Sequence, residues 1–298
     1  MFLRTAPFLF VLIWSTGWIT AGAATQVADP LAFLTGRFVI AAVCLAVFMA
    51  VSGVSFPRSR NMWQHGIVSG ILLHAIYLMG VWVSINNGLP ASIAGIVAAL
   101  QPLLAAILAV TYLHESLSRL QWFGLVLGFV GLATALGPSL FGLTGGALAN
   151  NAWLIGLNVM AITSVTVGSL YQKRFLANGD LRAITLMQYC GAGLVILPLA
   201  LVTGSTHIEL SLDAALVMAW AVFALSFGAV GLYLFLLRNG AVSKVSSFIY
   251  LIPPLVAVEA FFLFDEGLSL ITILGMTVTV LGVYLVNRNE IQEKDKAA

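Results

Sequence analysis

The chain has 298 residues, of which 61% are hydrophobic and 8% are charged, and its formal net charge is +2 at pH 7. Because soluble domains are about a quarter charged, this composition excludes a soluble globular enzyme, a disordered chain and a nucleic-acid-binding protein. The two cysteines lie in apolar runs at no metal or redox spacing, so a disulfide scaffold is excluded as well. The composition indicates a polytopic membrane protein.

Long apolar runs separated by turn residues predict ten membrane-spanning helices. Each span needs about 20 apolar residues to cross the hydrocarbon core, so ten spans leave short loops and no room for a second domain. In chain order the predicted spans are residues 7–24, 31–51, 62–84, 91–113, 120–137, 152–171, 182–202, 214–237, 245–264 and 270–287. The charged residues from Arg288 onward are expected to form a solvated, frayed tail.

The basic residues test this number of spans. Twelve of the thirteen lysines and arginines fall in the termini and the even-numbered loops, and the thirteenth, Arg37, lies inside the second span. Basic residues accumulate in cytoplasmic loops. The pattern therefore predicts a multi-pass protein of the cell's inner membrane with both termini in the cytoplasm.

The first span has a rival interpretation. Arg4, an apolar run and Ala21-Gly22-Ala23 are also typical of a cleavable signal peptide. Its removal would leave nine spans without changing the side of any later loop. We expect the segment to be retained, because the repeat described next requires a first helix in the first half.

The two halves of the chain share a pattern of turns, prolines and acidic residues. The equivalent pairs are Pro102 and Pro253 and Glu115 and Glu266 at a shift of 151 residues, and Asn87-Gly88 and Asn239-Gly240 at a shift of 152. Each half has five spans, an odd number, so the second half enters the membrane from the opposite side. Inverted repeats of this kind build many secondary transporters. The sequence predicts one repeat at 1–141, a second at 142–288, and a cytoplasmic tail at 289–298.

Several short stretches resemble the EamA-type repeats of the drug/metabolite transporter superfamily. They are Asn87-Gly88-Leu89-Pro90, Gln101-Pro102, His114-Glu115, Arg238-Asn239-Gly240, Leu251-Ile252-Pro253-Pro254 and Asp265-Glu266, together with the segment Leu12 to Trp18 and Pro30 followed by Arg37-Phe38. The resemblance covers essentially the whole chain. It implies an all-α polytopic membrane protein whose ten helices surround a central cavity and which moves metabolites such as amino acids outward, often with proton coupling. The chain departs from the family pattern at His114 and Asp265, where glycine is usual, and at Glu259, where an apolar residue is expected.

Candidate substrate-binding residues come from the centres of the spans, because transporters of this architecture bind substrate near the bilayer midplane. These candidates are Trp14, Trp18, His74, Tyr77, Gln101 and Tyr250. The tryptophan rings could stack on an amphipathic substrate, and core packing is the alternative. A histidine at this depth must be hydrogen-bonded or line water. Histidine also exchanges protons near neutral pH, so His74 is a candidate for proton coupling.

Three prolines are candidate hinges: Pro102, Pro253 and Pro254. Each removes a backbone donor and frees a carbonyl one turn earlier. Kinks at equivalent depth in the two halves would give bending points for alternating access.

Two charged residues lie well inside predicted spans, Arg37 and Glu259. Arg37 could pair with Glu259, be held by helix-end carbonyls or attract a substrate carboxylate, and the sequence favours a structural role. Glu259 could carry a proton, because burial favours the neutral form of a carboxyl group, or could be the partner of Arg37. Glu115 and Glu266 precede helices and are expected to be structural charges that complement helix amino termini.

Together these features predict a secondary active transporter that exports small metabolites, amino acids or related amphipathic compounds, by alternating access. Proton coupling is left open, and a passive channel is the alternative. An integral-membrane lipid-modifying enzyme would need a convergent catalytic cluster, and the four histidines are scattered. The chain is therefore expected not to be an enzyme, to need no cofactor or metal, and to act as a monomer on a small-molecule substrate in the bilayer, without nucleic acid.

Overall fold

The computed structural model describes residues 2–56, 58–89, 91–140, 152–264 and 269–296. Side chains are described in these ranges except at 2–4, 18, 91–92, 138–140, 260–264 and 289–296. The described chain is helical throughout apart from its connecting segments, and ten helical stretches are long and apolar enough to cross a membrane. The predicted all-α fold with ten spans is confirmed.

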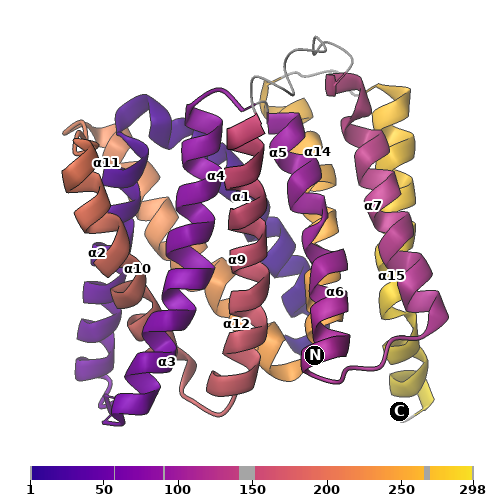
Figure 1. The fold of residues 1–298 in the computed structure, drawn as a ribbon, viewed down its shortest axis with the longest axis horizontal. Coiled ribbons are helices and arrows are strands. Elements are labelled where there is room, and N and C mark those ends of the chain that lie inside the picture. The colour runs from indigo at the N-terminus through magenta and orange to yellow at the C-terminus, as the bar shows by residue number, and fades with distance from the viewer. Residues whose placement is uncertain (1, 57, 90, 141–151, 265–268, 297–298) are drawn as a thin grey trace.

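The first five spans run alternately up and down the bundle (Figure 1). Their helices are α1 (Phe2–Val27), α2 (Pro30–Val51), the continuous α3, η1 and α4 (Arg60–Gly70, Ile71–Ile76, Tyr77–Asn86), the pair α5 and α6 (Ala91–Ala99, Gln101–Tyr112), and α7 (Arg119–Leu140).

The second five spans repeat this order. Their helices are α9 (Ala152–Leu176), α10 (Leu181–Thr203), the continuous α11, η2 and α12 (Leu212–Trp220, Ala221–Ala229, Val230–Asn239), the series α13, η3 and α14 (Val242–Ser247, Phe248–Leu251, Ile252–Phe264), and α15 (Leu270–Lys296). The last helix continues through the charged segment from Arg288 instead of fraying there.

Equivalent helices of the two repeats begin at the same residue types. Asp29 precedes α2 and Asp180 precedes α10, 151 residues later. Ser59 precedes α3 and Ser211 precedes α11, 152 residues later, and both serine hydroxyls accept a hydrogen bond from a backbone N–H of the first turn. Such caps satisfy donors that a helix start leaves free. The repeat found in the sequence is thus also present in the helix boundaries.

Four spans are irregular at equivalent places. The third and eighth each contain a π-helical segment, η1 and η2, near the middle. The fourth is interrupted at Leu100, with Pro102 in the first turn of α6, and the ninth has Pro253 in the first turn of α14 after a 3₁₀ segment. The sequence predicted the proline-linked breaks but not the π-helical segments.

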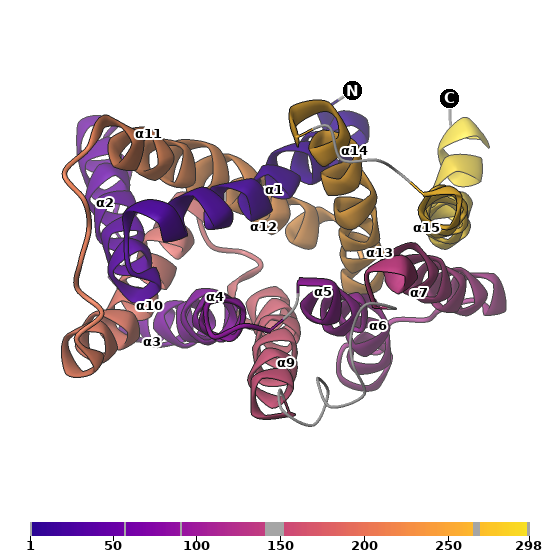
Figure 2. The ribbon, with the colours of Figure 1, turned by 90° about the horizontal axis from the view of Figure 1, so that it is seen from above.

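The two repeats meet along two pairs of equivalent helices. The most extensive helix contact joins α7 to α15, and the next joins α2 to α10. Seen from above, α7 and α15 lie together on one side of the bundle, away from α2 and α10 (Figure 2). Small residues allow helices in membranes to approach this closely, and here Gly124 and Gly131 of α7 face Gly282 and Gly275 of α15.

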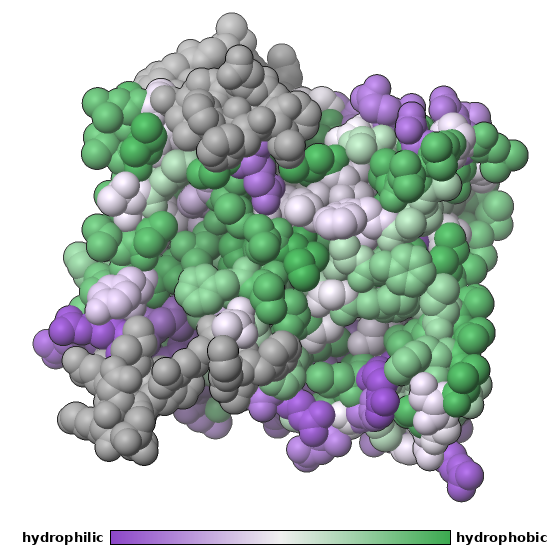
Figure 3. Space-filling view, turned by 180° about the vertical axis from the view of Figure 1, so that it is seen from behind, coloured by the Kyte–Doolittle hydropathy of each residue, from purple (hydrophilic) through white to green (hydrophobic). Residues whose placement is uncertain are grey.

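The outer surface matches a hydrocarbon environment. Large apolar side chains such as Leu194, Val202 and Leu274 are exposed. In the space-filling view hydrophobic residues cover the middle of the face, and hydrophilic residues gather toward its two ends (Figure 3). The fold therefore presents an apolar belt to lipid.

A single methyl group added at the α7–α15 contact should loosen the bundle. A Cβ at Gly282 would lie 2.5 Å from the backbone nitrogen of Gly128 and 2.6 Å from the carbonyl oxygen of Gly124. Backbone cannot yield as a side chain can, so we expect Gly282→Ala to lower the free energy of unfolding by about 1–3 kcal/mol. Thermal denaturation of purified protein measures the effect. Gly193→Ala is the matched control, because nothing lies within 4 Å of its added Cβ, and an equal loss in both variants would contradict the interpretation.

Candidate substrate cavity

A cavity of about 320 Å³ lies between helices of both repeats. Its walls come from α1, α2, η1 and α4 of the first repeat and from η2 and α12 of the second. The lining residues are Trp14, Gly17, Ala21, Gly22, Thr25, Arg37, Leu73, His74, Tyr77, Leu78, Val81, Trp82, Ile85, Leu225, Ala229 and Val230. The cavity therefore lies inside the bundle, at the junction of the two repeats.

The two ends of the bundle differ in charge. We call one end the basic end; its residues are Arg58, Arg60, Arg119, Lys173, Arg182, Arg238 and Lys244. The cavity extends away from this end, to Thr25 in the last two turns of α1 and Ile85 at the last turn of α4. Thr25 and Gly22 are exposed, so the cavity is open at the end opposite the basic one.

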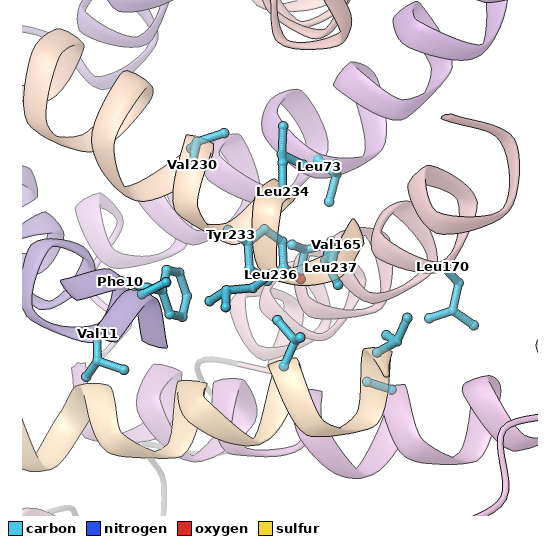
Figure 4. Close-up of a cluster of buried hydrophobic side chains, with 14 of the residues drawn as sticks. Phe10, Val11, Leu73, Val165, Leu170, Val230, Tyr233, Leu234, Leu236 and Leu237 are labelled. Atoms are coloured by element: carbon cyan, nitrogen blue, oxygen red, sulfur yellow. The ribbon is translucent and has the colours of Figure 1, made fainter. Parts of the chain in front are cut away.

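A buried hydrophobic cluster closes the cavity toward the basic end. Figure 4 shows side chains of this cluster, among them Phe10, Leu73, Val165 and Tyr233, meeting from several helices. The Phe10 and Tyr233 rings stack with centroids 5.6 Å apart, and the Trp14 ring lies 5.7 Å from that of Tyr233. Trp14 thus forms the floor of the cavity, with one side toward the open space and the other toward the cluster.

The charged and strongly polar side chains that line the cavity gather in one corner. They are Arg37, His74 and Tyr77, and we call this set the polar corner. Arg37 Nε donates a hydrogen bond of 2.8 Å to Ser226 Oγ. The His74 ring lies 5.2 Å from the Tyr189 ring. Both Arg37 and His74 are only 6% exposed.

The π-helical segments build this corner. A π-helical turn changes the backbone hydrogen-bonding pattern, and such turns often mark functional sites. His74 lies in η1 and Ser226 in η2. Two backbone carbonyl groups of these segments accept hydrogen bonds from hydroxyl groups on other helices. Ser164 Oγ donates to the Leu72 oxygen at 2.9 Å, and Tyr189 Oη donates to the Ser226 oxygen at 2.6 Å.

A buried amide network lies behind His74. Gln188 Nε2 donates to Ser69 Oγ at 2.8 Å and to Gln172 Oε1 at 2.7 Å. The Gln188 side chain also faces His74. Among the described residues, His74 Nε2 has no hydrogen-bond partner. Gln188 Oε1 is likewise buried and without a hydrogen-bond partner among the described residues.

The structure brings together three of the predicted substrate-binding residues, Trp14, His74 and Tyr77. Gln101 and Tyr250 are buried elsewhere and do not line this cavity. The Tyr250 ring packs against Gly128 of α7, inside a separate apolar cluster. The side chain of Trp18 lies outside the described residues.

The predicted charges have different partners from those expected. Arg37 bonds to Ser226, and Glu259 Oε1 accepts a hydrogen bond of 2.6 Å from Ser15 Oγ, so Arg37 and Glu259 do not pair with each other. The partner of Glu259 is a hydroxyl on α1, which no spacing in the sequence indicates.

Glu115 complements a helix start, but not that of the helix that follows it. Its carboxylate accepts hydrogen bonds from Val242 N at 2.8 Å and from Ser243 Oγ at 2.8 Å, at the beginning of α13 in the other repeat. Helix α7 is capped instead by Ser118 and Gln121, which bond to each other's backbone N–H. The expected role is therefore corrected from a local cap to a contact between repeats. Glu266 lies outside the described residues.

The described part of the chain contains no group of three His, Cys, Asp or Glu side chains placed to hold a metal ion. The cavity offers a polar corner in an apolar space, which is an arrangement for binding a small organic molecule.

Comparison with known proteins identifies the fold. The sequence pattern of the EamA-like transporter family matches residues 5–137 and 152–288, one copy in each half of the chain. The chain belongs to the EamA-like transporter family. It is therefore a membrane transporter and not an enzyme, as the sequence predicted.

Individual EamA-like relatives align over almost the full length. The chain is 26% identical to the uncharacterized inner membrane transporter YedA of Escherichia coli K12, over 94% of this chain and 89% of YedA. It is 23% identical to a probable terminal-alkyne amino-acid exporter of Streptantibioticus cattleyicolor, over 88% of this chain and 85% of that protein. A solved crystal structure of a protein with 20% identity covers 96% of both chains with a TM-score of 0.80, which supports the same fold.

Sequence reasoning missed several residues of this EamA-like site, notably Trp82, Gln188 and Ser226. The repeat contains a signal for two of them. The shift of 151 residues between the capping aspartates maps Arg37 onto Gln188, and the shift of 152 between the capping serines maps His74 onto Ser226. Applying the repeat to the candidate residues themselves would have found these partners.

The hydroxyl of Tyr189 should contribute measurably to the stability of this EamA-like bundle. Tyr189→Phe leaves the Ser226 carbonyl without the hydrogen bond that it receives inside the apolar interior. Interhelical hydrogen bonds in membranes are worth about 1 kcal/mol, so we expect a loss of that size. Thermal denaturation in detergent checks it, with Tyr284→Phe as the control because Tyr284 is 51% exposed. Equal melting temperatures for wild type and Tyr189→Phe would rule the role out.

Proposed function

We propose that the protein is a secondary active transporter that exports small amphipathic metabolites, amino acids or related compounds, across the inner membrane by alternating access. One observation carries this proposal. The cavity between the repeats is open at the end opposite the basic one and is closed toward the basic end by apolar packing and by contacts between the two repeats.

The distribution of charge supports an outward-facing orientation for the cavity. Cytoplasmic loops of membrane proteins carry the excess of lysine and arginine, and the basic end contains these residues. We therefore place the basic end and both termini in the cytoplasm. The relative YedA is described as an inner membrane transporter, which fits this location.

The contact between Glu115 and the start of α13 supports alternating access. We call Glu115, Val242 and Ser243 the cytoplasmic latch. The carboxylate belongs to the first repeat and its hydrogen-bond donors belong to the second. A negative charge at a helix start is stabilised by the free N–H groups and the helix dipole. Separation of the repeats at this end breaks the latch, so the latch favours the state in which the cavity faces outward.

The lining of the cavity supports an amphipathic substrate. Aromatic and aliphatic side chains, including Trp14, Trp82, Leu78 and Val81, form most of the wall, and the polar corner provides a single hydrophilic region. The relative from Streptantibioticus cattleyicolor is described as an exporter of an amino acid with a terminal alkyne. An amino acid with an apolar side chain has the same division into polar and apolar parts.

The hydrogen bonds of Ser15 support proton coupling through Glu259. Ser15 Oγ lies 2.8 Å from the Leu12 carbonyl oxygen and 2.6 Å from Glu259 Oε1. A hydroxyl has one proton to donate, so an ionised Glu259 and the Leu12 carbonyl compete for the proton of Ser15, whereas a protonated Glu259 would donate to Ser15 in return and leave both hydrogen bonds in place. We propose that Glu259 holds a proton in the outward-facing state, while His74 is the second candidate in the cavity.

Transport by reconstituted protein tests the proposed function. Proteoliposomes should show counterflow of labelled leucine or phenylalanine, and His74→Ala and Trp14→Ala should each reduce it about tenfold or more, the loss expected when a substrate-positioning contact is removed. The controls are His207→Ala and Trp153→Ala, which change exposed residues that do not line the cavity. Unchanged counterflow in both cavity variants would refute the proposal that substrate binds in this cavity. If counterflow by the wild-type protein does not respond to an imposed pH gradient, only the proposal of proton coupling is refuted.

Weakening the cytoplasmic latch should open the basic end more often. Glu115→Gln removes the charge from the start of α13, and a lost cap of this kind costs about 1 kcal/mol, which is a factor of roughly five in the population of two states. The measurement is the labelling rate of Val245→Cys, a buried position beneath the latch, in protein with Cys44 and Cys190 replaced by serine. Glu115→Gln should raise this rate several-fold, whereas the exposed control Glu209→Gln should not; equal rates in both would contradict the latch.

A further inference from the structure

We propose that the cavity recognises its substrate through a carboxylate group, which binds Arg37 at the polar corner, and that an amino group on the substrate is not required. The inference rests on the proposed transport function and goes further by naming the chemical group that is bound and the residue that binds it.

Arg37 is a buried cation that lacks an anionic partner among the described residues. Its side chain is 6% exposed and lines the cavity. Its described hydrogen bond joins Nε to Ser226 Oγ, and the carboxyl group of Glu259 is directed to Ser15 instead. A guanidinium stays charged in proteins, and a buried charge is costly unless it is paired. An anion in the cavity would supply the missing partner.

The donors that remain free suit a carboxylate. Ser226 uses one of the five N–H groups of Arg37, which leaves the two terminal nitrogens for a ligand. A guanidinium binds a carboxylate through two parallel hydrogen bonds, because the two planar groups have matching geometry. His74 Nε2 is buried, lines the same corner and has no partner within the described chain.

The same corner offers no anionic side chain to an ammonium group. The described lining contains neither aspartate nor glutamate. The two π-segment carbonyls already described, those of Leu72 and Ser226, accept hydrogen bonds from Ser164 and Tyr189. A cationic group would therefore meet the charge of Arg37 without an anion to offset it. Recognition therefore depends on the carboxylate group of the substrate and not on an amino group.

The rest of the cavity sets the orientation of the substrate. Apolar side chains line the route from the polar corner toward the open end, among them Leu78, Val81, Trp82 and Ile85 of α4. A carboxylate at Arg37 places the apolar part of the molecule along this wall. The site thus fits a small carboxylic acid with an apolar tail, with or without an amino group.

Three probes that share a phenyl ring and a short chain separate these possibilities. They are 3-phenylpropanoate, its neutral amide 3-phenylpropanamide, and the cation 2-phenylethylamine. Calorimetric titration of the purified full-length protein at neutral pH should show binding of the carboxylate and at least about tenfold weaker binding of the other two, since hydrogen bonds to a charged group carry the difference. Comparable binding of the amide or the amine, or no binding of the carboxylate, overturns the proposal.

Variants of Arg37 test the residue itself. Arg37→Gln should abolish the preference for the carboxylate, and Arg37→Lys should keep the preference with weaker binding, because lysine keeps the charge but not the planar fork. Arg182→Gln is the control, since Arg182 is exposed and pairs with Asp180 outside the cavity. If Arg37→Gln does not yield folded protein, the proposal is tested by the Arg37→Lys variant and by the binding of the three probes to the wild-type protein.

The outcome is separable from the proposed transport function. Counterflow of leucine with no preference for the carboxylate probe would refute only the role of Arg37. Absence of counterflow together with absence of binding would refute both proposals.

Discussion

The structure depends on one constraint, that backbone polar groups inside a bilayer must be satisfied by the protein itself. Regular helices meet it along most of each span. The π-helical segments have a different backbone hydrogen-bonding pattern, and hydroxyl groups of Ser164 and Tyr189 from neighbouring helices donate hydrogen bonds to the carbonyls of Leu72 and Ser226 in these segments. Polar side chains therefore gather where the irregular segments of the two repeats face each other. The cavity lies at that place for this reason.

The two repeats share a backbone plan but not their chemistry. Arg37 and Gln188 occupy equivalent positions, as do His74 and Ser226, so each repeat places a polar side chain at the junction. Among the described lining residues, the one cation comes from the first repeat, and its Nε donates a hydrogen bond to a neutral hydroxyl of the second. Divergence of equivalent residues thus turns a symmetric scaffold into a cavity with one polar corner and one apolar wall.

Much of the fold could be predicted from the sequence, because spans, loops and the repeat each depend on composition and spacing. The site could be predicted only in part. Depth along a helix follows from residue number, which is why Trp14 and His74 are correctly placed in the cavity. The direction in which a side chain points cannot be predicted from residue number when the helix is apolar on all sides. For this reason the sequence did not show that Gln101 and Tyr250 are buried in the core. The π-helical segments depend on tertiary contacts, such as the approach of Gly70 to the Gln188 backbone, and leave no local signal.

The guanidinium of Arg37, which has no anionic partner among the described residues, also affects how the membrane voltage acts on the protein. The cavity carries one fixed positive charge when empty and would be electrically neutral once a monoanion occupies it. In a cell whose interior is negative, the field then acts on the empty protein and draws its positive site toward the cytoplasm. One elementary charge moving through the whole field corresponds to about 2.3 kcal/mol per 100 mV. The membrane potential would therefore drive the return of the unloaded carrier, and each return would draw on that potential.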